Sequence, residues 1–277
     1  MQAEAEELLR EGRLAESLKK LQEQIRAKPA DAELRVFLFQ LLSVLGQWDR
    51  AMTQLNVAAE LDAKCLLMAQ VCRAALNCEA LRTEIFKGNR TPVVFGEPAE
   101  WVGWMVRANG MIAQGQYAGA KELRQRAFEA APTIPGSIDG NEFEWISDCD
   151  LRLGPILEAI IEGQYYWVPF SKIHQIEIET PADLRDVVWA PARFTWSNGG
   201  QAVGLIPGRY PGSQDSSDTA IQLARKTEWS EPDPGLYVGL GQRMFATDSN
   251  EYPLLTTARI TLGPTETEEQ AEDQKDG

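Results

Sequence analysis

Three short segments in the first half of the chain repeat one order of residue types. Residues 11–17 (EGRLAES), 45–51 (LGQWDRA) and 114–120 (QGQYAGA) each contain a glycine, one spacer, a large apolar or aromatic residue, two further spacers and a small residue. Gly12 precedes Gly46 by 34 residues, and Gly46 precedes Gly115 by 69, about two such periods. A fixed period of this length is typical of stacked helical hairpins.

The residue types in each segment predict how such a hairpin is built. The glycine ends the first helix, and the large residue (Leu14, Trp48, Tyr117) begins the second. The small residue (Ser17, Ala51, Ala120) lies where the two helices approach closely. Seventeen residues after the glycine, Pro29 and Pro132 end the second helix, and Ala63 takes that place in the middle unit.

The 34-residue period is that of tetratricopeptide repeats, so residues 1–132 are predicted to form a TPR-like α-helical repeat array. Residues 63–88, between the second and third units, predict a longer helix followed by a degenerate partner helix, and a proline-containing loop follows. Repeat arrays bind extended peptides or helices through the inner face formed by their first helices. The register places these residues on that face: Val36, Gln40, Ser43, Val44, Met105, Asn109 and Ile112. The same residues would alternatively bury the array against the second half of the chain.

The pattern changes to β-structure after Pro132. Residues 143–146, YYWVPF, IHQIEIE and the ranges 187–196, 201–206, 226–229, 242–246 and 254–261 are strand candidates, and SNGGQ at 197–201 is a hairpin-turn signal. Residues 133–262 therefore predict a mostly antiparallel β domain, a sheet or a partly open barrel. A short helix is expected near residues 181–186, with Pro181 following a capping Thr180. The whole chain is predicted to be an α+β protein.

Composition excludes several classes of function. The net charge of −14 and the pI of about 4.7 argue against nucleic-acid binding. The first residues lack the pattern of a secretory signal, and the apolar runs are too short to span a membrane. Residues 263–277 form an acidic tail that is expected to be disordered. The four cysteines (Cys65, Cys72, Cys78, Cys149) form no CxxC pair and suggest buried thiols in a reducing cytoplasm.

Candidate catalytic groups are few. The single histidine, His174, lies in a strand pattern without a recognisable nucleophile motif, and one histidine without a CxxC pair cannot make a standard zinc site. Residues 141–150 (NEFEWISDCD) contain four carboxylates, Glu142, Glu144, Asp148 and Asp150, which could bind a cation or act as acid and base. Their common parity, opposite Phe143, Trp145 and Cys149, favours a solvent-exposed strand face instead. No cofactor is predicted.

Two further features have alternative explanations. GLGQR at 239–243 and SNGG are glycine-rich, but neither opens a helix after a strand, so both are weak phosphate-loop candidates. The arginines Arg185, Arg193, Arg209 and Arg225 would bind a carboxylate ligand or, as the composition favours, neutralise acids of their own domain. An enzyme using residues 183–210 with Asp148 and Asp150 remains the alternative to a binding protein.

Four blocks together give the sequence a family resemblance. They are FLFQLLSVLGQWDRAMTQLNVAAELD at 37–62, LRLGPILEAIIEGQYYWVPFSKI at 151–173, DLRDVVWAPARFTWSNGGQAVGLIPGRYPGS at 183–213 and GLGQRMFATD at 239–248. With them, the chain resembles the ImpE/TagJ family of type VI secretion accessory proteins over about residues 6–262.

The resemblance implies a non-enzymatic cytoplasmic accessory protein. Members of that family contact the N-terminal helix of the small subunit of the contractile sheath, and are linked in this way to the ClpV-type ATPase that dismantles the sheath. The family has no catalytic motif to transfer to this sequence. A helical-repeat scaffold for a different peptide partner remains the alternative.

Overall fold

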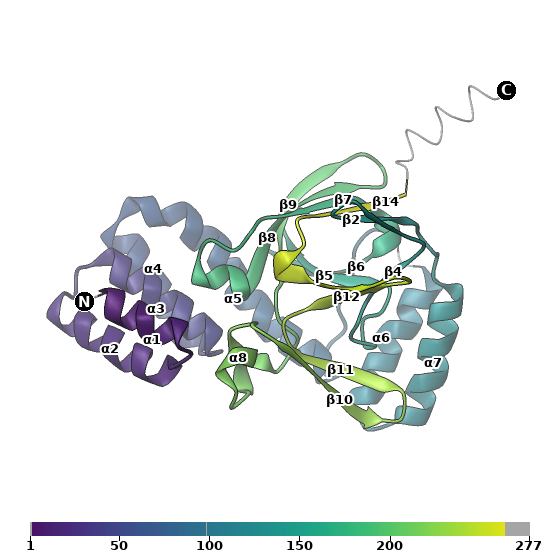
Figure 1. Ribbon diagram of the computed structural model, residues 1–277, viewed down its shortest axis with the longest axis horizontal. Helices are drawn as coiled ribbons and strands as arrows, with labels where there is room; N and C mark the ends of the chain where they lie inside the picture. The colour runs from purple at the N-terminus through teal and green to yellow at the C-terminus, as the bar shows by residue number, and fades with distance from the viewer. Residues whose placement is uncertain (1, 98, 264–277) are drawn as a thin grey trace.

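The computed structural model describes residues 2–97 and 99–263, with a helical first half and a β second half. The first helices extend to one side of the β half, and the last two long helices lie against its other end (Figure 1). Three helical hairpins account for most of the first half. They are α1 (Gln2–Arg10) with α2 (Leu14–Ala27), α3 (Ala32–Val44) with α4 (Trp48–Leu61), and α6 (Glu100–Ala113) with α7 (Tyr117–Ala130). The second helix of each hairpin begins at the predicted large residue, and Ser17, Ala51 and Ala120 are buried as predicted.

The three repeated glycines end their helices in one and the same geometry. Gly12, Gly46 and Gly115 have φ values of 79°, 65° and 72°, in the left-handed region where glycine has no steric penalty. The residue after each glycine donates its amide to a carbonyl five residues earlier: Arg13 to Leu8, Gln47 to Leu42 and Gln116 to Met111, at 2.8, 2.9 and 2.9 Å. This bond is the signature of a Schellman cap. The repeat prediction is thereby confirmed at its defining residue.

The segment between the second and third hairpins differs from the prediction. A 3-10 turn, η1 (Ala63–Cys65), leads into one 21-residue helix, α5 (Leu66–Phe86), and the expected degenerate partner helix is absent from the described residues. Residues 66–86 contain neither glycine nor proline, so the helix continues until Gly88, which has a φ of 74°. The strand β1 (Val93–Val94) follows and pairs in parallel with β6 (Gln164–Pro169).

The β half is built around a nine-stranded sheet of order β1-β6-β5-β9-β8-β7-β14-β2-β3 (Figure 1). Apart from the β1–β6 pair its ladders are antiparallel, as predicted. The other strands of this sheet are β2 (Gly136–Ile138), β3 (Asn141–Phe143), β5 (Ile156–Ile161), β7 (Ile173–Ile178), β8 (Trp189–Trp196), β9 (Gln201–Pro207) and β14 (Arg259–Leu262). A three-stranded sheet contains β4 (Ile146–Asp148), β12 (Met244–Thr247) and β13 (Glu251–Pro253), and β10 (Thr227–Asp233) pairs with β11 (Leu236–Gly241).

Short helical turns connect the strands: η2 (Phe170–Lys172), η3 (Leu184–Val187), η4 (Ser213–Asp215), α8 (Thr219–Gln222) and η5 (Leu254–Thr256). Two sequence expectations are corrected here. The short helix expected near residues 181–186 is the 3-10 helix η3, and its cap is Asp183, not Thr180; Asp183 forms a capping box with Asp186. The strand expected over 254–261 begins only at Arg259, because η5 occupies its first residues.

Strand β5 was not predicted, because it is buried at all six positions and therefore shows no alternation. Its two faces belong to different cores. Ile156 and Ile160 join the apolar cluster that includes α3, α4 and α5, whereas Leu157 and Ala159 join a second cluster with Phe245 and Leu254. The side chains of strand β8 are likewise divided between these two apolar clusters.

On β8, Trp189 faces the helices and Phe194 and Trp196 face the opposite cluster, as a regular strand requires. The pairing with β9 runs without a register shift from Trp189 to Thr195, so Pro191 makes no bulge. The boundary predicted at residues 132 and 133 falls between α7 and β2, and the division into two separate domains stays a prediction. Residues 264–277, which include nearly all of the predicted tail, lie outside the described part of the chain.

Candidate functional site

The seven residues predicted for the inner face lie on two helices and are mostly buried. Gln40, Ser43, Val44, Met105 and Asn109 are buried, and Val36 and Ile112 are half-buried. The residues numbered 36–44 lie on α3 and those numbered 105–112 on α6, and α4 and α5 lie between these helices in the stack. The structure therefore does not gather the seven into one exposed surface.

The α3 residues contact the β half of the same chain. The Gln40 Oε1 atom accepts the Leu184 amide at 3.1 Å. The Arg209 guanidinium donates to the carbonyl oxygens of Val44 at 2.8 Å and Ser43 at 3.3 Å. On α6, Asn109 donates to the Ile85 carbonyl of α5 at 2.8 Å. Much of the predicted inner face thus holds the chain's own segments, and its role as a partner surface stays a prediction.

Part of the α3 face remains open beside η3. A hollow of about 450 Å³ lies between α1, α3, η1 and residues 182–184, and Val36 and Gln40 line it. Leu9, Phe37 and Leu184 give this hollow apolar walls, and Glu33, Asp62 and Asp183 place carboxylates around it. We call it the α1–α3 groove.

A series of buried charged side chains connects helix α5 of the helical half with the β half. At its centre is Glu158 of β5, whose side chain is completely buried. Arg82 of α5 binds it with two bonds of 2.6 and 2.9 Å, and Arg243 and the Tyr165 hydroxyl also donate to it. The charge series extends in both directions. Arg82 approaches Glu79 at 3.5 Å on one side, and on the other side Arg243 pairs with Asp148.

The environment shifts the pKa values of these groups in opposite directions. Burial raises the pKa of the Asp148 carboxyl to about 7, against the opposing effect of Arg243. Burial also acts to raise the pKa of Glu158, but Arg82 and Arg243 outweigh it and hold the value at about 2. Glu158 therefore remains ionised between two guanidinium groups, as a buried carboxylate must if it is to be compensated.

Asp148 and Asp150 are buried, and the prediction that they lie on a solvent-exposed strand face is wrong. Each carboxylate accepts hydrogen bonds from groups inside the protein. Tyr210 donates to Asp148 at 2.9 Å, and the Gly239 amide and Arg152 donate to Asp150 at 3.0 and 2.6 Å. The alternation failed as a guide because the strand is interrupted. Strand β3 ends at Phe143, and β4 begins at Ile146 and buries Ile146 and Asp148, the opposite parity.

The glycine-rich segment 239–243 packs against the buried charged groups around Asp148. A Cβ atom on Gly239 would lie 2.2 Å from the Tyr210 ring, and one on Gly241, whose φ is 99°, would lie 2.1 Å from the Lys226 carbonyl. Gly239 therefore leaves room for the Tyr210 ring, whose hydroxyl donates to Asp148, and Gly241 allows the close approach of the Lys226 backbone. This segment has a structural explanation that needs no phosphate.

Two of the four scattered arginines join the halves by binding helix ends. Arg209 donates to carbonyls at the end of α3, and Arg225 donates to those of Arg10 and Leu9 at the end of α1, at 2.8 and 3.2 Å. A cation is favourable there because the carboxyl end of a helix carries partial negative charge. Arg185 and Arg193 instead pair with carboxylates of the β half. Sequence reasoning identified these arginines but not the partners of Arg209 and Arg225.

The remaining chemical candidates have structural surroundings. His174 Nδ1 lies 2.8 Å from the Gly263 carbonyl oxygen. Burial raises the pKa of all four cysteine thiols, to about 11 for Cys72 and Cys78. Over residues 2–97 and 99–263, no group of three or more His, Cys, Asp or Glu side chains is placed to hold a metal ion. No helix within these ranges combines the length and apolar character needed to cross a membrane.

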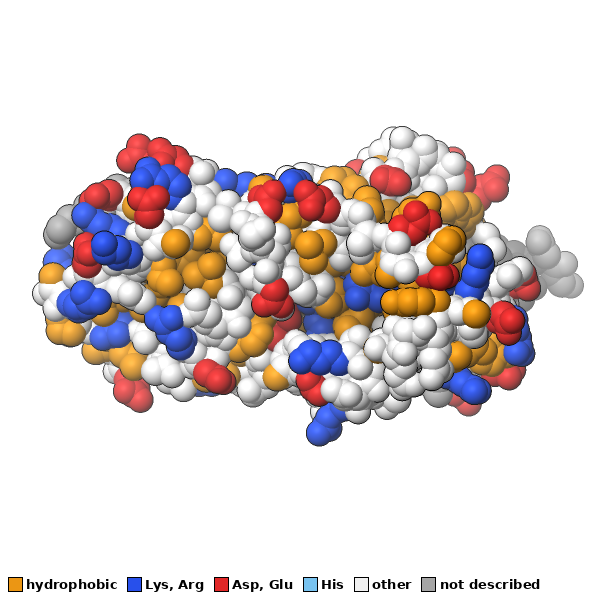
Figure 2. Space-filling view, turned by 90° about the horizontal axis from the view of Figure 1, so that it is seen from below, with side chains coloured by type: hydrophobic (Ala, Val, Ile, Leu, Met, Phe, Trp, Pro, Cys, Tyr) orange, Lys and Arg blue, Asp and Glu red, His pale blue; other side chains and the backbone are white. Residues whose placement is uncertain are grey.

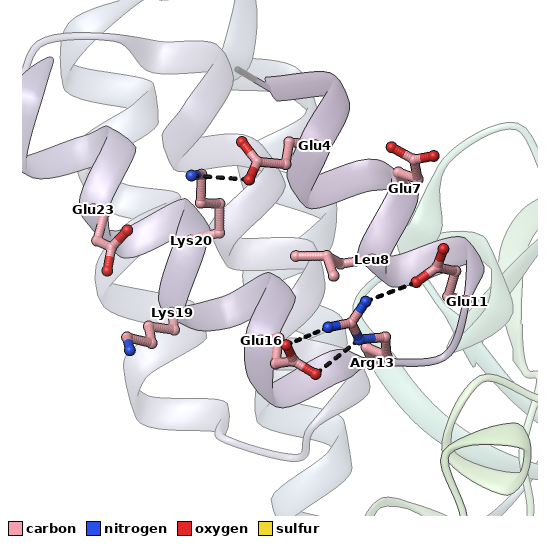
Figure 3. A pocket seen from close by; sticks show the side chains of 9 residues that line it. All are labelled: Glu4, Glu7, Leu8, Glu11, Arg13, Glu16, Lys19, Lys20 and Glu23. Atoms are coloured by element: carbon pink, nitrogen blue, oxygen red, sulfur yellow. Dashed lines mark hydrogen bonds and ion pairs between the residues drawn. The ribbon is translucent and has the colours of Figure 1, made fainter.

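A hollow of about 600 Å³ lies on the outer side of α1 and α2 (Figure 3). Five of its charged side chains form ion pairs: Lys20 with Glu4 at 3.0 Å, and Arg13 with Glu11 and Glu16 at 3.0 and 2.5 Å. Acidic and basic side chains are also interspersed on the face in Figure 2. That face presents no continuous basic tract of the kind that nucleic-acid binding uses.

Comparisons with known proteins agree with this architecture. Residues 140–261 match the family described as ImpE protein, and residues 8–74 match the tetratricopeptide repeat. The chain is 50% identical to the type VI secretion system accessory component TagJ of Pseudomonas aeruginosa over 262 residues, which are 95% of this chain and 92% of that protein. The crystal structure of protein VPA1032 from Vibrio parahaemolyticus superposes with a TM-score of 0.86 at 27% identity, covering 95% of this chain and 99% of the other.

Proposed function

The chain belongs to the ImpE/TagJ family of type VI secretion accessory proteins, and we propose that it acts as a non-enzymatic adaptor in the cytoplasm. In this role it binds a helical segment of the small subunit of the contractile sheath. It thereby links the sheath to the ClpV-type ATPase that dismantles it. The proposal rests on the family membership and on the helical-repeat architecture, which is a scaffold for binding peptides and helices.

The α1–α3 groove is the observation that supports this function best. Val36 and Gln40, two of the predicted inner-face residues, line this open hollow. Its walls come from the first helices of two successive hairpins, the surface that repeat arrays use for ligands. The apolar side chains of Leu9, Val36 and Phe37 provide a seat for the apolar positions of an amphipathic helix.

The buried charges support a structural rather than a catalytic centre. Glu158 and Arg243 are fully buried, and each is bonded to two or more protein groups. Asp148 borders a hollow of about 400 Å³, but its carboxylate is itself fully buried and bonded to Arg243 and Tyr210. A catalytic acid or base needs access to a substrate proton.

Calorimetric titration of the full chain with a synthetic peptide of the sheath subunit's N-terminal helix tests the proposal. We expect a dissociation constant of about micromolar, because one short helix buries a small interface. Val36→Glu should weaken binding about tenfold or more, since it places a charge against apolar side chains. The matched control is Val93→Glu, at an exposed valine of β1.

The outcomes separate the parts of the proposal. No heat and no competition at high peptide concentration would refute binding of the sheath helix, leaving a scaffold for another peptide. Binding that is insensitive to Val36→Glu would retain the adaptor and exclude the α1–α3 groove as its site.

A further inference from the structure

The helical layer covers only part of the sheet face that it packs against. Near α4 and α5, Trp189 of β8 is covered: its ring lies 6.2 Å from that of Trp48, and its indole donates to Glu79 at 2.9 Å. Farther along the same face of β8 and β9, Pro191, Arg193, Val203 and Leu205 border a hollow of about 530 Å³. We call this hollow the α5–β9 groove.

Helix α5 forms the opposite wall of the groove. Its residues Gln70, Val71 and Ala74 line the hollow, and one turn farther on the helix meets the turn between β5 and β6, where Cys78 Sγ lies 3.6 Å from the Gly163 carbonyl oxygen. That contact fixes the distance between the helix and the sheet. No residue lines both this groove and the α1–α3 groove.

The groove and the adjoining turn of α5 expose an unusual amount of apolar surface. Val203 is 72% exposed, and on α5 Leu67 is 75% and Val71 47% exposed. Leu67, Val71 and Ala74 are spaced by four and three residues, so they form one stripe along the helix. A stripe of exposed apolar side chains beside an open apolar groove is typical of a protein-binding surface.

The charges at the groove indicate what kind of partner fits. Glu162 and Glu179 line it, both are exposed, and neither carboxylate has a hydrogen bond or ion pair with any described residue. The one cation of the lining, Arg193, pairs with Glu177 at 3.4 Å. The groove therefore combines apolar walls with carboxylates that lack a partner. A complementary ligand has an apolar stripe flanked by lysine or arginine.

We propose that the α5–β9 groove is a second docking surface, and that it binds an amphipathic helix with basic flanks from a partner protein. The helix lies alongside α5 across β8 and β9, so that it extends the helical layer over the uncovered sheet face. Its apolar positions contact Val71, Val203 and Leu205, and its basic side chains meet Glu162 and Glu179. Two separate docking surfaces are what an adaptor that connects two proteins requires.

A labelled amphipathic peptide tests the proposal by fluorescence anisotropy with the full chain. The probe is a helix of about 18 residues with leucine on one face and lysine on its flanks, and a second peptide has glutamate in place of lysine. We expect the lysine peptide to bind at least about tenfold more tightly than the glutamate peptide. The double variant Leu67→Asn/Val203→Asn, which keeps the net charge, should weaken lysine-peptide binding about tenfold or more. Val93→Asn is the matched control.

The carboxylates are tested separately with Glu162→Gln/Glu179→Gln, which should remove most of the preference for the lysine peptide. The proposal is overturned if both peptides bind equally, or if Leu67→Asn/Val203→Asn binds the lysine peptide as the native chain does. It is also overturned if sedimentation shows a dimer that this double variant dissociates, since a second copy would then occupy the groove. Val36→Glu should leave lysine-peptide binding unchanged, so the two grooves are judged independently.

Discussion

Replacing Glu158 by glutamine tests whether the buried charge chain holds the two halves together. The substitution preserves the size of the side chain but leaves Arg82 and Arg243 facing an amide instead of a carboxylate. Removing one partner of a buried ion pair typically costs about 3–5 kcal/mol. Glu79 and Asp148 still lie beside the two arginines, so the lower end of that range applies, about 3 kcal/mol. For a chain of this length the melting temperature should fall by about 6–12 °C.

Urea unfolding measures the loss directly, as a lower midpoint with an unchanged slope. Glu162→Gln, on the exposed turn after β5, should change the free energy of unfolding by less than about 0.5 kcal/mol. In a double-mutant cycle with Arg82→Met, the coupling energy should exceed about 1 kcal/mol. A loss below about 1 kcal/mol for Glu158→Gln, with the slope unchanged, would refute the inference that this carboxylate joins the halves.

Three other predictions concern pH and two glycines. The folded chain binds a proton on Asp148 up to about pH 7, although the free carboxyl has a pKa of 3.8. Lowering the pH from 8 to about 5.5 should therefore raise the free energy of unfolding by about 2 kcal/mol, and Asp148→Asn should remove that gain. Below about pH 4 the lowered pKa of Glu158 should reverse the trend, and urea titrations in which stability rose with pH between about 5.5 and 8 would contradict the Asp148 prediction. Gly239→Ala should lower the melting temperature by several degrees or prevent folding, because its Cβ would overlap the Tyr210 ring, and a melting curve like that of the native chain would contradict the assigned packing. Gly103→Ala, where nothing lies within 4 Å in the interior of α6, should instead raise stability by about 0.5–1 kcal/mol in the same assay, and a loss would show an unrecognised contact.

The helical repeats could be read from the sequence because each is defined by local chemistry. A glycine such as Gly46 ends a helix through its own backbone conformation, and Trp48 begins the next helix within a few residues. These effects act over one turn and do not depend on the rest of the fold. The long helix α5 was also predicted, but the prediction of a partner helix after it within residues 63–88 was wrong, because α5 continues as one helix to Phe86.

The buried charges could not be predicted, because they depend on contacts between distant residues. Arg82 and Glu158 are 76 residues apart, and Arg243 is 85 residues beyond Glu158. A carboxylate in a run such as ILEAII carries one local signal, a charge in an otherwise apolar strand, which would have marked Glu158 as a buried group with a partner. Asp148 and Asp150 were predicted to be exposed because the alternation assumed one continuous strand, whereas β3 ends at Phe143 and β4 covers only Ile146–Asp148.

Hydrogen exchange of the full chain with and without the sheath subunit's N-terminal helix tests the proposed function most directly. Binding in the α1–α3 groove should slow amide exchange at residues 6–10 and 32–40 and in the segment 182–184, and Val36→Glu should abolish that protection. Protection confined to other surfaces, or no protection at peptide concentrations well above micromolar, would contradict the proposal that this groove receives the sheath helix.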